Sequence, residues 1–203
     1  MVDDRATVVR ERKAALRRSV LATRGALPLA ARVDAASLLT SAVLTLPEVV
    51  AAQSVALYVS IGTEPSTAEL LDVLRSRDVR VLLPVLLGQD LDLDWAIYET
   101  RERLSPGPRG LWTPDGDRLG VEAVGAADVV LVPAVAVGED GTRLGRGGGS
   151  YDQALGRVPP GRPVLALLYD GELLPAVPAE PHDRRVTGVV TPSGARHLVG
   201  PAT

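Results

Sequence analysis

The sequence predicts an α/β fold with a mainly parallel sheet. Short, apolar, β-prone segments occur at residues 54–60, 128–137 and 163–169, as expected for strands that are buried on both faces. A helical pattern at residues 66–77 lies between two strand-like segments, and such a strand-helix-strand unit forms a right-handed parallel crossover. The length of 203 residues fits one domain, which we expect to span residues 1–203.

Two helices are predicted before the first strand. Residues 3–24 form a polar helical pattern, and Pro28 suits the first turn of a second helix over residues 29–44. The apolar positions of the second helix are Val33, Leu38, Leu39 and Val43. Ser66 is expected to cap the helix that follows the first strand, with Glu69 as its capping-box partner.

The second half of the chain alternates between strands and irregular segments. Residues 91–98 alternate Asp with apolar residues, which predicts a strand with one wet face. Six Pro and Gly residues make 104–118 an irregular loop, in which Trp112 either plugs the core or forms a platform for a flat ligand. Residues 128–137 are expected to form one buried strand that leads into a glycine-rich loop, and residues 186–190 the last strand.

The glycine-rich loop is the most informative part of the sequence. Residues 138–155 contain six glycines within twelve residues, together with Arg143, Arg146 and Asp152. Glycine lets a ligand approach the backbone closely, and N–H groups at a helix N-terminus beside two guanidinium groups attract an anion such as phosphate. The Asp152 carboxylate is suited to hold Mg²⁺ against that phosphate. A flexible glycine linker is the alternative interpretation.

The loop differs from two familiar nucleotide-binding patterns. A Walker A loop requires a Lys after its last glycine, and no Lys follows any of these glycines. A Rossmann fingerprint requires a third glycine where Ser150 stands, and it occurs early in a chain. Ligands nevertheless bind beyond the carboxyl ends of the strands in open α/β sheets, so the loop lies where a site is expected.

The first predicted helix carries a basic stripe. Of the 22 cationic residues 21 are Arg, and the single Lys13 falls with Arg10, Arg17 and Arg24 within an arc of about 60° on the helix. This stripe is either a solvated surface or an edge that faces a phosphate.

Composition and charge exclude several classes of function. The absence of cysteine rules out disulfides, thiolate metal sites and Cys nucleophiles. The two histidines, His182 and His197, cannot form a multi-His metal cluster, which leaves oxygen-coordinated Mg²⁺ as the expected metal. The net charge of −3 predicts neither nucleic acid nor an anionic membrane as a partner. No apolar run has the length of a membrane span and no signal-peptide core is visible, so we expect a cytoplasmic protein.

Four ordered pieces make the chain similar to the 5-formyltetrahydrofolate cyclo-ligase family, also called methenyltetrahydrofolate synthetases. They are Lys13-x-x-Leu16-Arg17, Tyr58-x-Ser60 with Glu64 and Thr67, Leu131-Val132-Pro133-Ala134 with the segment from Gly141 to Asp152, and Glu180-x-His182-Asp183. The third piece is the most specific, and the resemblance covers nearly the whole chain. It implies a three-layer α/β/α fold related to sugar-phosphate isomerase and CoA-transferase domains.

The resemblance implies an enzyme that converts 5-formyltetrahydrofolate to 5,10-methenyltetrahydrofolate with ATP and Mg²⁺, releasing ADP and phosphate. In this family the formyl oxygen attacks the γ-phosphate, and N10 then closes the ring. Phosphoryl transfer depends mainly on positioning and charge neutralisation, which the basic residues and the loop N–H groups provide. The expected partners are therefore small molecules, ATP and a reduced folate. A monomer and a small homo-oligomer both remain open.

The resemblance also implies roles for individual residues. Arg146 and Asp152 are the expected catalytic residues, and Asp152 and Asp183 are the expected magnesium ligands. Val59 and Glu64 match positions that contact the substrate. The residues expected to contact ATP are Lys13, Arg17, Arg143, Leu144, Gly145, Arg146, Gly147, Gly148, Gly149, Ser150 and Tyr151. Residues 146–150 are expected to contact the folate as well.

Structural roles remain open for several of these residues. Asp183 also suits a turn, Lys13 and Arg17 also suit a helix surface, Glu64 also suits a loop that begins the next helix, and Tyr151 also suits the core.

Three departures from the family pattern leave other functions open. Ser150 stands where a second aromatic residue is usual, and Thr113 and Thr187 stand where acidic residues are common. These changes affect the expected ligand affinity and substrate more than the use of ATP, because one stacking ring contributes about 1 kcal/mol. The alternative function is a paralogue that binds nucleotide or folate without turnover. A sugar-phosphate isomerase or CoA-transferase-like activity is a third possibility that rests on fold analogy alone.

Overall fold

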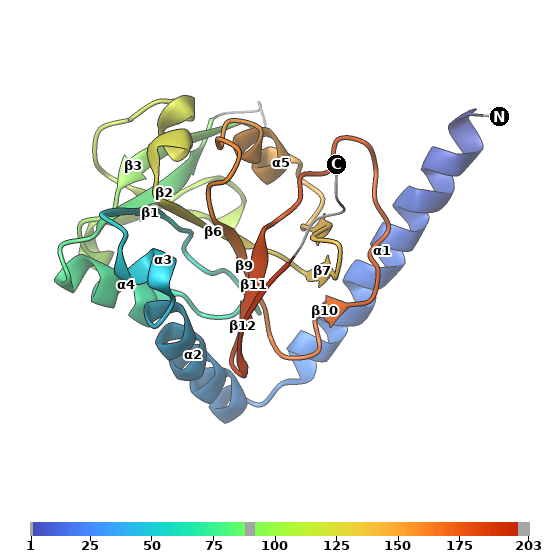
Figure 1. Cartoon of the computed structure of the whole chain (residues 1–203), viewed down its shortest axis with the longest axis horizontal. Helices are drawn as coiled ribbons and strands as arrows, with labels where there is room; N and C mark the ends of the chain where they lie inside the picture. The colour runs from blue at the N-terminus through green and yellow to red at the C-terminus, as the bar shows by residue number, and fades with distance from the viewer. Residues whose placement is uncertain (1, 88–91, 199–203) are drawn as a thin grey trace.

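The computed structural model describes residues 2–87 and 92–198, and a seven-stranded sheet is its main feature (Figure 1). The strands of this sheet are β1 (Ser54–Ala56), β2 (Arg80–Leu86), β3 (Leu93–Ile97), β6 (Val129–Pro133), β9 (Val164–Leu167), β11 (Gly188–Thr191) and β12 (Gly194–His197). Their order is β12-β11-β9-β6-β1-β2-β3. The five inner strands run parallel, and the two edge strands pair antiparallel to their neighbours. The predicted α/β fold with a mainly parallel sheet is confirmed.

Helices cover both faces of this sheet. On one face lie α2 (Leu29–Leu44), α3 (Pro47–Val50) and α4 (Ala68–Ser76). On the other face lie α5 (Ser150–Leu155) and the 3-10 helix η3 (Val121–Ala126). The result is three layers, helices, sheet and helices, as the resemblance implies.

The sheet divides the core into two clusters, because successive residues of a strand point to opposite faces. On β6, Val129 and Leu131 pack with α2 and α4, whereas Val130 and Val132 pack with α5 and η3. All four side chains are at most 1% exposed. Burial on both faces explains why the inner strands read as unbroken apolar runs.

Helix α1 (Val2–Ala26) lies beside one end of the large sheet, where Figure 1 shows it as a long diagonal helix. It covers a smaller three-stranded sheet of β7 (Ala136–Gly138), β8 (Arg143–Leu144) and β10 (Leu173–Leu174). The residues in this contact are Leu16, Val20 and Leu21 of α1 with Val135, Ala136, Leu144 and Val177. The small sheet thus holds α1 against the segment that leads into the glycine-rich loop.

The segment over residues 104–118 is more regular than predicted. It contains an antiparallel hairpin of β4 (Leu104–Pro106) and β5 (Trp112–Pro114), joined by the 3-10 turn η2 (Pro108–Gly110). A further 3-10 turn, η1 (Arg101–Arg103), precedes the hairpin. The Pro and Gly residues lie in and around the turn, which is where their backbone preferences allow the chain to reverse.

Several strand boundaries also differ from the predictions. β1 ends at Ala56, short of the predicted 54–60. The single strand predicted over residues 128–137 is two strands, since the chain leaves the large sheet after Pro133 and enters the small one at Ala136. The strand predicted last is followed by β12, whose residues are mostly exposed. An exposed edge strand has no apolar run by which the sequence could reveal it.

The wet face predicted for residues 91–98 is wrong, and Leu91 lies outside the described residues. Asp94 is 8% exposed and Trp95 is 1% exposed. The Asp94 carboxylate accepts hydrogen bonds from the N–H groups of Trp95 and Gly120 at 2.6 and 2.7 Å. Because η3 packs on this edge strand, Asp94 is buried and satisfied by backbone donors.

The predicted cap of the helix that follows β1, Ser66, is also wrong. Helix α4 begins at Ala68 with Thr67 as N-cap, and no side chain caps it. Ser66 Oγ accepts only a long bond, 3.4 Å, from the Ala68 N–H. Thr67 Oγ1 instead donates to the Tyr58 carbonyl oxygen at 2.7 Å, which fixes the loop between β1 and α4.

Helix α2 presents part of its predicted apolar face to solvent. Leu39 and Val43 are buried as predicted, but Val33 and Leu38 are 60% and 55% exposed.

In the described part of the chain no single helix is long and apolar enough to cross a membrane. Helices α1 and α2 meet that test only together, with a bend of 106° between them.

A buried ion pair fixes the C-terminal end of α1. Arg24 is 1% exposed, and its Nε and Nη2 donate to the two carboxylate oxygens of Glu172 at 2.6 and 2.7 Å. Arg24 Nη2 also donates to the Ala134 carbonyl oxygen at 2.8 Å, and the guanidinium lies 5.6 Å from the centre of the Tyr169 ring. A solvated surface is therefore the wrong interpretation of the basic stripe at Arg24.

We predict that Arg24→Ala lowers the free energy of unfolding by about 3–5 kcal/mol, because it leaves the Glu172 carboxylate buried without a countercharge. Urea denaturation measures the change. The control is Arg103→Ala, since Arg103 pairs with Glu99 and both side chains are 56% exposed. Breaking this exposed pair should change the free energy of unfolding by less than about 1 kcal/mol. Equal effects of the two substitutions would contradict the prediction.

Candidate active site

A pocket of about 270 Å³ brings the predicted site residues together. Its lining includes Lys13, Arg17, Val59, Glu64, residues 143–152 and Asp183. Pro133 at the end of β6 also lines it, so the pocket lies beyond the carboxyl ends of parallel strands, as expected for this sheet. Every residue to which the family resemblance gave a catalytic, binding or metal role lines this pocket, whereas Arg10 and Arg24 of the basic stripe do not.

The glycine-rich loop is folded against α1, so a flexible linker is the wrong interpretation. Gly147 and Gly149 have φ values of 96° and 76°, which favour glycine, and Gly149 is the N-cap of α5. A Cβ at Gly145 would lie 2.7 Å from Nη1 of Arg143. Arg17 Nε donates to the Gly145 carbonyl oxygen at 2.7 Å. The backbone angles thus favour glycine at positions 147 and 149, and the arginines packed around the loop hold it in place.

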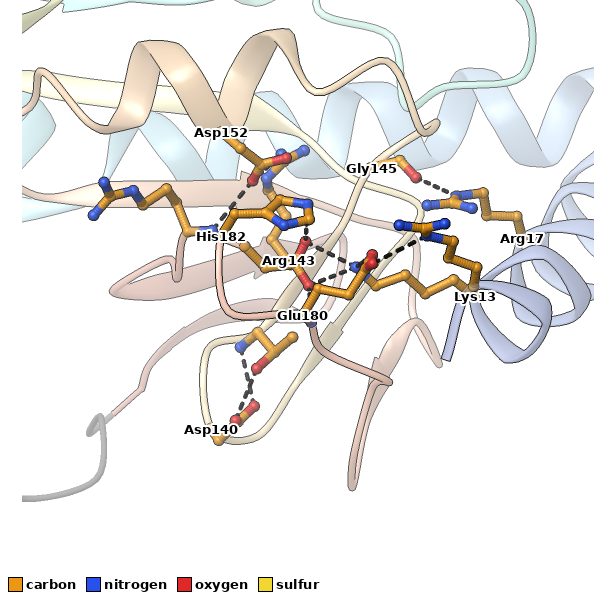
Figure 2. Close-up of polar contacts among 12 residues, drawn as sticks. Lys13, Arg17, Asp140, Arg143, Gly145, Asp152, Glu180 and His182 are labelled. Carbon is orange, nitrogen blue, oxygen red and sulfur yellow. Dashed lines mark hydrogen bonds and ion pairs between the residues drawn. The ribbon is translucent and has the colours of Figure 1, made fainter. Parts of the chain in front are cut away.

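Lys13 connects α1 to the segment near the C-terminus (Figure 2). Lys13 is 4% exposed, and its Nζ donates to Asp183 Oδ1 and Oδ2 at 2.8 and 2.6 Å and to Glu180 Oε2 at 2.8 Å. The Glu180 N–H donates to Asp183 Oδ2 at 2.7 Å. The hydrogen bond from Lys13 lowers the pKa of Glu180. The basic stripe therefore faces the pocket at Lys13 and Arg17 instead of bulk solvent.

A second ion pair lies at the start of α5. Arg143 Nη2 donates to Asp152 Oδ1 at 3.0 Å, and the Arg184 N–H donates to the same oxygen at 3.2 Å. Arg143 Nη1 donates to the Pro133 carbonyl oxygen at 3.2 Å, and the guanidinium lies 5.7 Å from the centre of the Tyr151 ring. Asp152 is therefore oriented by Arg143 and by the residue that follows Asp183.

Three buried polar atoms of the pocket lack hydrogen-bond partners among the described residues. They are Tyr58 Oη, Tyr151 Oη and Arg143 Nε. Buried polar atoms in native proteins are nearly always paired, so these three are free to bond a ligand. Burial raises the pKa of Tyr58 and of Tyr151, which keeps both hydroxyl groups protonated and able to donate.

Glu64 and Arg146 form a third ion pair in the pocket. The Glu64 side chain is 6% exposed, and its Oε1 lies 2.9 Å from Arg146 Nε. Oε2 accepts the Ile61 N–H at 2.9 Å. Burial raises the pKa of Glu64, while the Ile61 N–H and the Arg146 charge act in the opposite direction. The Glu64 carboxylate therefore does two things: it accepts a hydrogen bond within the loop before α4, and it lines the pocket in a fixed position.

The donor set of the pocket fits Mg²⁺. Asp152 and Asp183 are carboxylates in one pocket, and the hydrogen bond from the Arg184 N–H to Asp152 ties their segments together. Mg²⁺ prefers such oxygen ligands and keeps several waters or phosphate oxygens. Glu180, His182 and Asp183 also offer ligand atoms that lie within 4.8 Å of one another.

The sequence profile of the 5-formyltetrahydrofolate cyclo-ligase family matches residues 9–192. The chain belongs to this family. A protein of Mycolicibacterium smegmatis named 5-formyltetrahydrofolate cyclo-ligase is 40% identical over 184 residues, which cover 89% of this chain and 93% of that protein. The protein of that name from Escherichia coli strain K12 is 35% identical over 156 residues, covering 74% of this chain and 84% of its own. The predicted family is confirmed.

Solved structures of similar proteins support the same fold. An Aquifex aeolicus 5,10-methenyltetrahydrofolate synthetase has a TM-score of 0.80 and 28% sequence identity, and the match covers 94% of this chain and 95% of that one. A 5,10-methenyltetrahydrofolate synthetase from Mycoplasma pneumoniae has a TM-score of 0.70, with 89% and 98% of the chains covered. At 20% identity the second likeness concerns the fold alone.

Part of the cyclo-ligase pocket was missed by reasoning from the sequence. Pro84 and Leu86 of β2 and Leu93 of β3 form an apolar wall, and only the pairing of these strands reveals it. Trp112 is 45% exposed and lines the pocket, so the core plug is the wrong interpretation and the ligand platform stays a prediction. Arg109 also lines the pocket, without any signal in the sequence that distinguishes it from other arginines.

We predict that Arg146→Ala raises the pKa of Glu64 further, because the guanidinium beside the carboxylate favours its charged form. Carbon-13 NMR of the Glu64 carboxyl group measures this pKa. Burial already holds the folded pKa above the unfolded value. The stability contributed by Glu64 is therefore present while the group is protonated and is lost as pH rises through the folded pKa.

The control for this titration is Arg103→Ala, which removes an exposed arginine that does not line the pocket. This substitution should leave the pKa of Glu64 unchanged. A pKa that is equally unchanged in Arg146→Ala would show that burial and the Ile61 N–H alone set it.

Proposed function

We propose that this chain converts 5-formyltetrahydrofolate to 5,10-methenyltetrahydrofolate, using ATP with Mg²⁺ and releasing ADP and phosphate. The main support is one pocket that joins an arginine-lined glycine loop, three carboxylates and three buried donors without partners among the described residues, in a chain of the cyclo-ligase family. ATP and a reduced folate are its partners, and its proposed location is the cytoplasm. Residues 1–203 are proposed to form one domain.

The phosphates of ATP are assigned to the polar half of the pocket. Lys13 and Arg17 of α1 and Arg143 of β8 supply positive charge there. The N–H groups of residues 145–149 and the first turn of α5 supply backbone donors, as helix N-termini do for phosphates elsewhere. Asp152 and Asp183 are the proposed ligands of the Mg²⁺ that accompanies the nucleotide, and this ion would neutralise phosphate charge.

The folate is assigned to the half of the pocket near Glu64. The Glu64 carboxylate is fixed by Arg146 and by the Ile61 N–H, and it can accept hydrogen bonds from the amino and ring N–H groups of the pterin. Val59 also lines the pocket, and the hydroxyl groups of Tyr58 and Tyr151 have no partners among the described residues and can donate to a ligand. The pterin and the phosphates then meet across the glycine loop.

The proposed reaction has two steps. The formyl oxygen attacks the γ-phosphorus and ADP leaves, which turns that oxygen into part of a phosphate leaving group. N10 then attacks the formyl carbon, the ring closes, N10 loses its proton to solvent, and the C–O bond breaks as the oxygen departs with inorganic phosphate. Arg146 belongs to the glycine loop and its side chain pairs with Glu64 in the pocket, so its charge is available to the transferring phosphoryl group and the folate. No covalent nucleophile is needed, in agreement with a chain that lacks cysteine.

The rise in near-ultraviolet absorbance of methenyltetrahydrofolate tests the proposed function. Purified protein is mixed with 5-formyltetrahydrofolate, with ATP and Mg²⁺ supplied together or withheld one at a time. A rise that requires both is the expected result. Folate binding by folded protein without any rise would instead support the non-catalytic paralogue.

We predict that Asp152→Asn lowers turnover about 100-fold or more while folate binding stays nearly unchanged, because a proposed metal ligand loses its charge. Steady-state kinetics and equilibrium dialysis with the folate measure the two effects. Asp140→Asn is the matched control: Asp140 pairs with Arg185 at 3.3 Å but lies on the β7–β8 turn and does not line the pocket. The control should keep normal kinetics, and unchanged turnover in Asp152→Asn would remove Asp152 from the metal site.

A further inference from the structure

A free cation lies at the rim of the pocket, on the turn of the β4–β5 hairpin. Arg109 lines the pocket, and its Nη1 is 3.8 Å from the position that a Cβ would take at Gly148. The other basic residues of the lining have oxygen partners: Lys13 with Asp183, Arg17 with the Gly145 carbonyl, Arg143 with Asp152, and Arg146 with Glu64. Within residues 2–87 and 92–198, Arg109 makes no such bond.

The hairpin turn presents this arginine in an unusual backbone conformation. Arg109 has φ 58° and ψ 23°, the left-handed region that residues with a Cβ rarely adopt. The turn is closed by hydrogen bonds from the Gly107 N–H to the Leu111 carbonyl at 2.7 Å and from the Leu111 N–H to the Pro108 carbonyl at 3.1 Å. Backbone strain of this kind is concentrated at functional sites. The side chain is therefore displayed at the tip of a closed turn, beside the glycine loop.

The hairpin also borders the apolar half of the pocket. Leu111 and Trp112 from the hairpin line the same cavity as Pro84, Leu86 and Leu93 of the sheet edge. The Trp112 side chain is large and 45% exposed, so one part of its surface is open to a ligand. The groups assigned to phosphate come from α1, β8 and the glycine loop instead. The hairpin thus presents both a free positive charge, Arg109, and an aromatic surface, Trp112, to the pocket.

We propose that Arg109 is a specificity-determining residue that binds the glutamate carboxylates of the reduced folate, whose aminobenzoyl ring lies against Trp112. This inference rests on the proposed function. A folate tail places carboxylates directly after an aromatic ring, which matches an arginine and a tryptophan on one hairpin. The nucleotide phosphates already have Lys13, Arg17 and Arg143. Each added glutamate brings another carboxylate within reach of the arginine, so the apparent affinity rises with tail length.

The test compares folates that carry one glutamate and several glutamates. KM values for each folate and for ATP are measured with wild type, Arg109→Asn and Arg109→Lys. Asn removes the charge and tolerates left-handed backbone, whereas Lys keeps the charge. The control is Arg103→Gln, which removes an exposed arginine just before the hairpin that does not line the pocket.

Arg109→Asn should raise KM for the polyglutamate folate about three- to fivefold, the scale of an exposed ion pair, and should raise KM for the monoglutamate less. The KM for ATP should stay unchanged in Arg109→Asn. Arg109→Lys should resemble wild type, and high salt should reduce the preference of wild type for long tails, because the pair is screened. Arg103→Gln should have no effect.

Two results would overturn the assignment: KM values for both folates that do not change in Arg109→Asn, or an increase confined to KM for ATP, which would assign the arginine to phosphate. Quenching of tryptophan fluorescence by the two folates separates this inference from the proposed function. Binding that depends on tail length and on Arg109 in a protein without turnover would contradict only the function. Turnover without any dependence on tail length would contradict only the inference.

Discussion

The contact of Lys13 with Asp183 and Glu180 is the interaction on which the pocket depends. It joins a helix at the start of the chain to a segment about 170 residues later, and neither belongs to the large sheet. Burying charges is costly, and the four short hydrogen bonds around Lys13 and Asp183 offset that cost. Arg24 and Glu172 make a second buried ion pair at the C-terminal end of α1. With both pairs formed, Arg17 is held against the glycine loop and the polar half of the pocket is complete.

The pocket contains buried polar atoms without hydrogen-bond partners among the described residues, which is rare in a protein core. Tyr58 Oη, Tyr151 Oη and Arg143 Nε are buried without partners among the described residues, and each such atom costs about 1–3 kcal/mol. Burial also raises the pKa of Glu64, because it disfavours the charged form of the carboxyl group. A ligand that pairs with these groups recovers this free energy on binding. The rest of the sheet, buried on both faces, supplies the stability that such a site requires.

The inner strands, the family and the pocket residues around the glycine loop could be predicted from the sequence, because they depend on local patterns. Apolar runs reveal inner strands such as β6, and the order of glycines and arginines reveals the loop. The errors concern residues whose environment is set by distant segments. Asp94 reads as exposed until η3 covers it, and Trp112 fits the core or a ligand until the hairpin is seen at the pocket. Arg109 is one of 21 arginines until the fold shows which of them lacks a partner at the site.

The ion pairs within the pocket affect the form in which a nucleotide binds there. Lys13 and Arg143, proposed to face the phosphates, are each bonded to a carboxylate, Asp183 and Asp152. A bare triphosphate would therefore meet two negative charges as well as two positive ones. Asp152 and Asp183 would hold a divalent cation, whose charge would offset that repulsion and would leave Lys13 and Arg143 available to the phosphate oxygens. In the proposed function, these ion pairs of the pocket thus favour a nucleotide that carries its metal.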